Sequence, residues 1–208
     1  MSSLGRLHLI TDNRPGQDPL AVVRAALSVA RAELVVQVRV TDETTDRQAY
    51  DLARRVTVLC ARYGATCLVN DRLHVALAVG ADGGHVGADD LPVGAARAVL
   101  GSAAVLGATA REAATAVEAV AAGASYLGVG SVHPTTSKDG LPPPIGAAGL
   151  RAVAAAVSVP VIAIGGVTAA DVPDLRAAGA YGVAVIAALS HAADPARATA
   201  AFVEALTC

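Results

Sequence analysis

The sequence contains no tryptophan and a single phenylalanine, Phe202, and charged residues make up only 16% of its 208 residues. A formal net charge of −2 argues against a nucleic-acid or anionic-membrane partner, since either needs a basic surface. No uninterrupted apolar run reaches 18 residues, and residues 1–6 lack a signal-peptide pattern. We therefore expect a cytoplasmic protein that binds neither nucleic acid nor membrane.

Cysteine is also scarce. Cys60, Cys67 and Cys208 are odd in number and show no metal-ligand spacing, so we interpret them as buried or terminal thiols in a reducing compartment. A glycine-rich dinucleotide fingerprint is missing as well, because residues 11–14 (TDNR) follow the first apolar run. This absence disfavours a doubly wound open sheet.

Alanine, valine and other hydrophobic residues are abundant, at 54% of the chain, which suits close packing of helices on a sheet. The pattern is clearest in residues 160–186. An apolar run at 161–164 is followed by a glycine pair, an amphipathic segment that Gly179 closes, and a second apolar run at 182–186. A strand, a glycine turn, a helix and a strand form a right-handed βαβ unit.

The same alternation extends over the whole chain, with no linker that would mark a second domain. It predicts an α/β fold, a single-domain (β/α)8 TIM barrel over residues 1–208. The expected strands are 7–10, 34–38, 66–69, 84–86, 104–106, 126–132, 161–164 and 182–186. The expected helices are 19–32, 44–63, 73–79, 92–100, 111–122, 146–157, 168–178 and 194–206.

Polar residues gather where these strands end, and the chemistry of a barrel lies at the C-terminal ends of its strands. Asp71 and Asp90 end adjacent strands, so their carboxylates either converge on Mg²⁺ or cap the following helices. The other polar or glycine residues at this rim are Thr11, Asp12, Gln37, Arg39, Asn70, Asp89, Thr109, Thr135, Thr136, Ser137, Lys138, Gly165 and Gly166.

Two features of the rim indicate phosphate. Gly165 and Gly166 either bring backbone N–H groups close to an anion or only form a tight turn. Lys138 lies in a loop rich in glycine and proline, where it either neutralises a phosphate or is a solvated surface lysine. Together they predict two phosphorylated ligands, one of them a pyrophosphate, and transfer chemistry between them.

At these residues the sequence resembles the thiamine phosphate synthase family, which also includes thiazole tautomerases. The resemblance runs from Leu7 to Leu189, and its motifs occur in the family's order and spacing. The motifs are LHLITD at 7–12, VQVR at 36–39, LVNDR at 68–72, GADGGHVGADDLP at 80–92, YLGVGSVHPTTSKDG at 126–140, AIGGVT at 163–168 and GVAVI at 182–186.

The resemblance implies that hydroxymethylpyrimidine pyrophosphate is joined to thiazole phosphate, giving thiamine phosphate and pyrophosphate. In such a synthase the bond to pyrophosphate breaks early, so the protein must stabilise the departing negative charge. The implied residues are Asp71 and Asp90 for Mg²⁺; Gln37, Arg39, Asn70 and Lys138 for pyrophosphate, with Arg39 and Lys138 acting in catalysis; and Thr109, Thr135, Ser137, Gly166, Ile186 and Ala187 for the remaining substrate contacts.

The chain departs from the family pattern at four positions. Thr41 replaces a lysine, Ala88 a glutamine and Ala187 a serine, and Arg111 stands where the family often has histidine. Two alternatives therefore remain, a thiazole phosphate tautomerase and a catalytically inactive ligand-binding paralogue. His133 is added relative to the family. It either lines the pocket or, as a hypothesis, supplies the catalytic proton shuttle of a tautomerase. The oligomeric state stays open, a homo-oligomer included.

Overall fold

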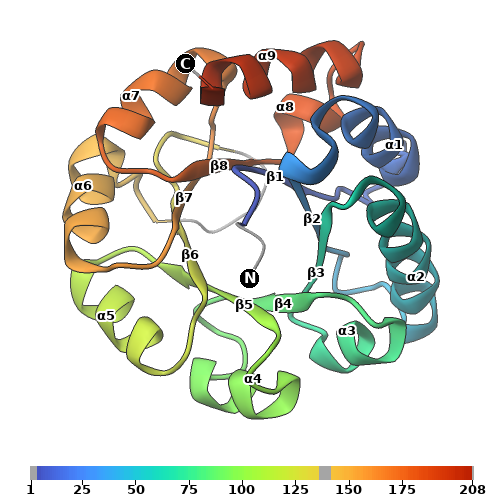
Figure 1. The fold of residues 1–208 in the computed structure, drawn as a ribbon, viewed down its shortest axis with the longest axis horizontal. Coiled ribbons are helices and arrows are strands. Elements are labelled where there is room, and N and C mark those ends of the chain that lie inside the picture. The colour runs from blue at the N-terminus through green and yellow to red at the C-terminus, as the bar shows by residue number, and fades with distance from the viewer. Residues whose placement is uncertain (1–3, 136–141, 208) are drawn as a thin grey trace.

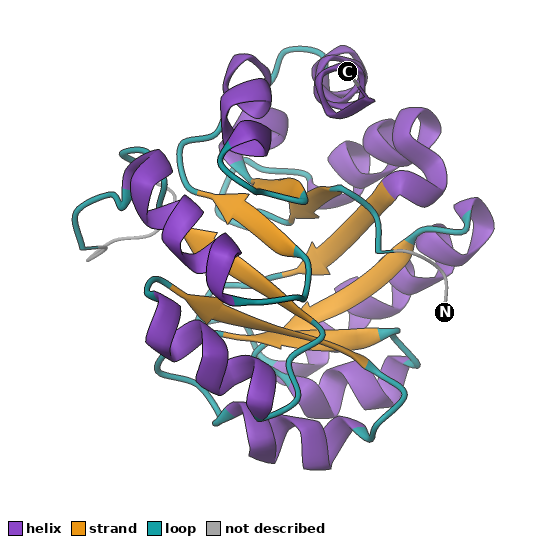
Figure 2. Cartoon of the chain, turned by 60° about the vertical axis from the view of Figure 1, so that its left-hand side comes forward, coloured by secondary structure: helices purple, strands orange, loops and turns teal. Residues whose placement is uncertain are grey.

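Eight parallel strands close into a barrel in chain order, and the last strand pairs with the first. The computed structural model describes residues 4–135 and 142–207. Figure 1 looks along the barrel and shows the strands as an inner ring that the helices surround. Figure 2, turned by 60°, shows the strands enclosed between helices on both sides. The predicted TIM barrel is confirmed.

Each strand of the ring is followed by at least one helix. The strands are β1 (Leu7–Ile10), β2 (Leu34–Val38), β3 (Thr66–Asn70), β4 (Gly83–Val86), β5 (Val105–Ala110), β6 (Tyr126–Gly130), β7 (Val161–Ile164) and β8 (Gly182–Val185). The helices are α1 (Pro19–Ala30), η1 (Arg31–Glu33), α2 (Asp46–Tyr63), α3 (Leu73–Val79), α4 (Val93–Leu100), α5 (Ala113–Ala121), α6 (Gly146–Ala156), η2 (Ala169–Asp171), α7 (Val172–Ala177), α8 (Ala187–Ser190) and α9 (Pro195–Thr207).

Several predicted boundaries were wrong, and two of them affect the site. β5 continues to Ala110, which pairs with Val129 of β6, so Thr109 lies within the strand and not after it. β6 ends at Gly130 and not at residue 132. The short helix α8 was not predicted at all. Its four residues are too few to show a helical period in the sequence.

Helix ends follow ordinary capping chemistry. Asp18 accepts hydrogen bonds from the backbone N–H groups of Leu20 and Ala21, both at 3.1 Å, and so starts α1. Thr45 and Gln48 form a capping box, which is why α2 begins at residue 46 and not at 44 as predicted. Gly64 ends α2 with φ 69°, a left-handed conformation that glycine adopts without strain.

The core has two layers. The larger layer lies between the strands and the helices and includes Cys60 and Cys67, which are buried free thiols as predicted. The smaller layer fills the barrel. Its buried members are Ile10, Val35, Leu68, Tyr126, Ile162 and Ala184.

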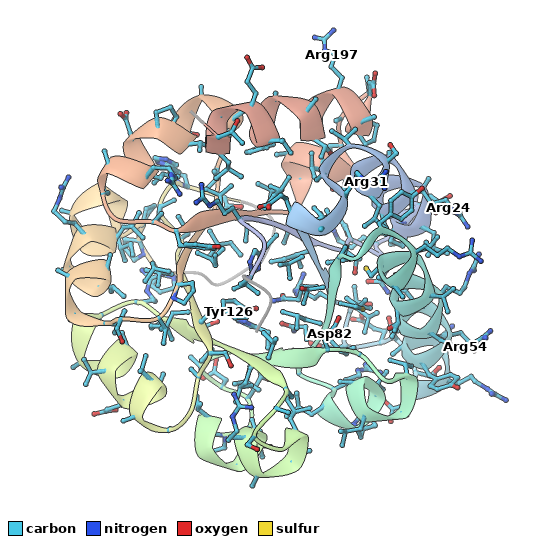
Figure 3. All side chains as sticks on the ribbon, in the orientation of Figure 1. Arg24, Arg31, Arg54, Asp82, Tyr126 and Arg197 are labelled. Carbon is cyan, nitrogen blue, oxygen red and sulfur yellow. The ribbon has the colours of Figure 1, made fainter. Side chains whose placement is uncertain are left out.

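Charge and surface follow the same division. Figure 3 places Tyr126 within the ring of strands, whereas Arg24, Arg54 and Arg197 project from the outer helices into solvent. Within the described ranges, no helix combines the length and hydropathy needed to span a bilayer.

Candidate active site

The centre of the barrel holds a chain of hydrogen-bonded polar side chains. Gln37 Nε2 lies 3.4 Å from the Tyr126 hydroxyl, which lies 3.0 Å from His85 Nδ1. His85 Nε2 lies 3.0 Å from Thr109 Oγ1. Strands β2, β6, β4 and β5 each contribute one member. Gln37 and Thr109 were predicted to contact substrate, and the structure links them through two residues that sequence reasoning missed.

Burial keeps this centre uncharged. It lowers the pKa of His85 to about 4, although the negative charge of Asp90 opposes the change. Burial also raises the pKa of Tyr126, against a hydrogen bond from Gln37. His8 lies in the same interior, with its ring centroid 5.1 Å from that of Tyr126, and burial lowers its pKa to about 3. At neutral pH both imidazoles are therefore neutral and the phenol is protonated.

The end of β1 organises its neighbour β2. Thr11 Oγ1 donates to the carbonyl of Arg39 at 2.8 Å and accepts from its N–H at 2.9 Å, so the backbone of Arg39 is held on both sides. The Asp12 carboxylate, buried at the rim, accepts two guanidinium hydrogen bonds from Arg14, at 2.8 and 2.6 Å. These bonds lower the pKa of Asp12, so it is ionised at neutral pH.

The predicted metal ligands follow the neighbouring strands β3 and β4. Asp71 has φ 58°, a left-handed backbone that aspartate adopts more readily than most other non-glycine residues. Asp90 lies in the loop after β4, and its Oδ2 accepts the Gly87 N–H at 2.7 Å. Both aspartates are exposed at the rim. Asp90 therefore fixes its own loop, and the predicted alternative of capping the following helix is not observed, since Pro92 is the N-cap of α4.

The two carboxylates suit Mg²⁺ better than a metal that needs a complete set of protein ligands. Among the described residues, there is no group of three or more His, Cys, Asp or Glu side chains that could hold a metal ion. Mg²⁺, however, usually takes one or two carboxylates and completes its shell with water and substrate phosphate oxygens. Two accessible carboxylates in the loops after adjacent strands fit that requirement.

The opposite half of the rim contains the glycine pair. Gly165 and Gly166 have φ 99° and 65°. A Cβ at Gly165 would lie 2.4 Å from Ser131 Cβ, and one at Gly166 would lie 2.4 Å from the Pro134 carbonyl. The turn therefore requires glycine for two reasons, its backbone conformation and the close approach of the loop that follows β6. Directly after β8, Ile186 is the N-cap of α8, and Ala187 is the first residue of that helix.

His133 belongs to this loop, and its backbone N–H donates to the Gly165 carbonyl at 3.0 Å. Its Nε2 is shielded from solvent, has no hydrogen-bond partner among the described residues, and lies 3.8 Å from Asp171 Oδ1. Partial burial opposes ionisation of Asp171, but hydrogen bonds from Thr168 and the charge of His133 lower its pKa overall. Nε2 thus faces a structural carboxylate.

Arg111 stands where the family resemblance implies a histidine. Its Nη1 donates to the Gly130 carbonyl at 2.7 Å and its Nη2 to the Pro143 carbonyl at 2.6 Å. The guanidinium, directly after β5, thus contacts the last residue of β6 and the loop that follows it. Thr135 is half-buried in this loop, whereas the predicted Ser137 and Lys138 lie outside the described residues.

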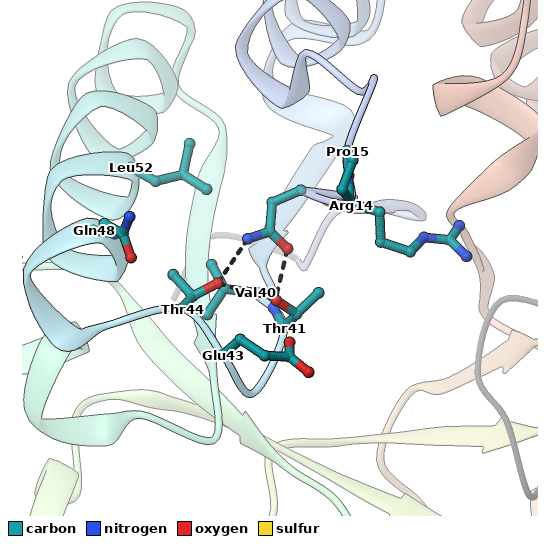
Figure 4. A pocket seen from close by; sticks show the side chains of 9 residues that line it. Arg14, Pro15, Val40, Thr41, Glu43, Thr44, Gln48 and Leu52 are labelled. Carbon is teal, nitrogen blue, oxygen red and sulfur yellow. Dashed lines mark hydrogen bonds between the residues drawn. The ribbon is translucent and has the colours of Figure 1, made fainter.

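A pocket of about 670 Å³ lies between the loops that follow β1 and β2 (Figure 4). Asn13 crosses it, donating to Thr44 Oγ1 at 2.9 Å and accepting from the Thr41 N–H at 3.0 Å. Thr41, which stands where the family has lysine, contributes a hydroxyl to the lining. None of the predicted substrate-binding residues lines this pocket.

A family model and curated relatives indicate the same family. A family model described as thiamine monophosphate synthase matches residues 7–189. The chain is 86% identical over 207 residues to the thiamine-phosphate synthase of Salinispora tropica, covering 100% of both chains. It is 43% identical to that of Haloquadratum walsbyi, covering 96% of this chain and 90% of the relative.

A solved structure points the same way. The thiamine phosphate pyrophosphorylase from Pyrococcus furiosus superposes with a TM-score of 0.86 at 33% identity, covering 97% of this chain and 95% of the other. The region that the family model matches, residues 7–189, includes every predicted motif, since the motifs span residues 7–186. The chain belongs to the thiamine monophosphate synthase family.

Proposed function

We propose that this protein is a thiamine phosphate synthase, a transferase that joins hydroxymethylpyrimidine pyrophosphate to thiazole phosphate and releases pyrophosphate. The observation that carries the proposal is the 86% identity, over the whole chain, to a thiamine-phosphate synthase. The positions of the rim residues support it, because strands β2 to β5 bring Gln37, Asn70 and Thr109 to one end of the barrel.

The pyrophosphate half lies at β2, β3 and β4. Asp71 and Asp90 would hold Mg²⁺, which supplies positive charge to neutralise the leaving pyrophosphate. Arg39, whose backbone Thr11 clamps, and Asn70 at the end of β3 would contact pyrophosphate oxygens. Lys138, outside the described residues, would add a second cation. Catalysis then consists of stabilising a departing anion and holding the thiazole nitrogen in line.

The thiazole phosphate half lies at β6, β7 and β8. Gly166 allows close backbone approach, and Ile186 and Ala187 lie after the neighbouring strand. Thr135 and Ser137 would face the thiazole. His133 would hold this loop against Gly165, since its backbone N–H is bonded there and its Nε2 faces Asp171.

Two observations disfavour the isomerase alternative. Arg111, at the position of the tautomerase histidine, is engaged with two backbone carbonyls. His133, the substitute considered for proton transfer, has its Nε2 shielded from solvent. An acid/base mechanism needs a group within hydrogen-bond reach of the transferred proton. The inactive-paralogue alternative is disfavoured by the retention of both predicted metal carboxylates.

The test is a coupled assay for thiamine phosphate, with and without Mg²⁺. We expect Mg²⁺-dependent product that Asp71→Ala abolishes, while Asp51→Ala, on the exposed face of α2, retains wild-type turnover. Product formation that persists in Asp71→Ala would contradict the assigned metal ligands. Absence of product from the wild-type protein, with both substrates bound, would refute the proposed function.

A further inference from the structure

His85 and Tyr126 occupy the barrel centre without any assigned role in the reaction. Each is at most 8% exposed. The two side chains share one hydrogen bond of 3.0 Å, between His85 Nδ1 and the Tyr126 hydroxyl. At their outer ends they contact Gln37 and Thr109, the two side chains from β2 and β5 that were predicted to contact substrate. The four residues form one relay across the barrel.

The strands leave room for this relay by placing glycine opposite it. A Cβ at Gly107 would lie 2.2 Å from Tyr126 Cζ and 2.4 Å from His85 Nδ1. A Cβ at Gly128 would lie 3.2 Å from His85 Cε1. Any side chain at residue 107 would therefore separate the imidazole from the phenol, and the barrel interior is built around their contact.

The hydrogen-bond directions along the relay follow from its donors and acceptors. Gln37 Nε2 donates to the Tyr126 oxygen, so the buried Tyr126 proton needs an acceptor, and His85 Nδ1 is the one within reach. His85 then carries its own proton on Nε2 and donates it to Thr109 Oγ1. This arrangement leaves two groups for a ligand, Gln37 Oε1 as an acceptor and the Thr109 O–H as a donor. An acceptor suits an N–H group and not a pyrophosphate oxygen, so in this arrangement Gln37 faces the pyrimidine and not the pyrophosphate, to which the family resemblance assigned it.

We propose that His85 and Tyr126 are positioning residues that give the barrel centre this fixed hydrogen-bond polarity, so that Gln37 presents an acceptor and Thr109 a donor to the pyrimidine ring. The inference rests on the proposed function and deepens it. An aminopyrimidine offers an N–H donor beside a ring-nitrogen acceptor, which complements this pair. The corresponding oxopyrimidine carries an acceptor and a donor in the reverse order, and the relay selects against it.

The test separates positioning from simple core packing. Tyr126→Phe keeps the ring and removes the hydroxyl. Tyr181→Phe is the matched control, because its hydroxyl donates to the Leu4 carbonyl at 2.6 Å and belongs to no part of the relay. Kinetic constants are measured for both substrates. Affinities for the amino- and oxopyrimidine pyrophosphates are measured by titration calorimetry, which does not depend on turnover.

We expect Tyr126→Phe to raise KM for the pyrimidine substrate about tenfold, the effect of losing one buried hydrogen bond, and to leave KM for thiazole phosphate within twofold. The preference of the wild type for the amino compound, at least about tenfold, should fall towards unity in Tyr126→Phe and persist in Tyr181→Phe. A packing defect alone would lower thermal stability in both variants without changing this preference.

Each opposing result has a separate meaning. Wild-type protein that binds both pyrimidines equally overturns the inference, whether or not it forms product. If the wild type forms product and Tyr126→Phe has the same KM and the same preference as the wild type, the positioning role of Tyr126 is refuted. The proposed function then stands. If Tyr126→Phe fails to fold by circular dichroism, Thr109→Val tests the other end. It removes the donor at constant volume and must weaken the amino compound more than the oxo compound, and the reverse order overturns the inference.

Discussion

The two neutral histidines inside the barrel predict a specific loss of stability in mild acid. Burial lowers the pKa of His8 to about 3 and that of His85 to about 4. In the unfolded chain a histidine titrates near pH 6.5. Between these values the unfolded state binds more protons than the native state, so the free energy of unfolding rises with pH. The stability that both residues contribute is complete above about pH 6.5 and is lost as pH falls towards about 4.

The magnitude follows from the same values. At about pH 5 the unfolded histidine lies about 1.5 pH units below its pKa, which corresponds to about 2 kcal/mol for each residue. The native His8 and His85 remain neutral there, so we expect the free energy of unfolding to be about 4 kcal/mol lower at about pH 5 than at about pH 7.5. Asp12 and Asp171 contribute only at lower pH, because their pKa values are lowered from an already acidic range.

The assay is urea unfolding, followed by circular dichroism at constant ionic strength across this pH range. His8→Gln should reduce the loss to about 2 kcal/mol, since only His85 then titrates on unfolding. His74→Gln is the control, because that side chain is 64% exposed. A wild-type loss below about 1 kcal/mol, or the same loss in His8→Gln as in wild type, would refute the assignment of buried neutral histidines.

Three further predictions concern local geometry. Gly166→Ala places a Cβ 2.4 Å from the Pro134 carbonyl, and we expect at least about a tenfold rise in KM for thiazole phosphate; Gly94→Ala, where a Cβ meets nothing within 4 Å, should not change KM, and equal effects would contradict the argument. Arg111→Gln loses two charge-assisted hydrogen bonds and should lower the free energy of unfolding, measured by calorimetry, by about 2 kcal/mol. Arg151→Gln loses one 3.4 Å bond and should lower it less. The reverse order would refute the anchoring role of Arg111. Thr45→Ala removes the capping box of α2 and should cost about 1 kcal/mol in urea unfolding, whereas Thr115→Ala should cost less.

The alternation of apolar runs and helical segments was sufficient to predict the barrel, since parallel strands buried on both faces read as short continuous hydrophobic runs. It was also sufficient to place Gln37, Asn70 and Thr109 at one rim, because the C-terminal ends of parallel strands meet there. The boundaries of β5 and β6 were wrong because strand pairing, which is set between strands, decides where they end.

The sequence analysis did not predict the relay, for a related reason. In strands whose residues are all buried, such as β4 and β6, hydrophobic pattern does not distinguish the face towards the helices from the face towards the barrel centre. His85 and Tyr126 were therefore read as part of motifs with no direction assigned. The signal that was available is the glycine placement in β5 and β6, since Gly107 and Gly128 leave the space that the two rings fill.

The close contacts at Gly107 also limit how this chain can change over time. A single methyl group there would overlap both Tyr126 and His85, so no substitution at residue 107 is acceptable while both large rings remain. Conversely, a smaller residue at 85 or 126 would open a void that a larger residue at 107 could fill. The three positions should therefore change together in divergent relatives, as one inherited unit, and a lineage that replaces glycine at 107 should also have abandoned the imidazole–phenol pair.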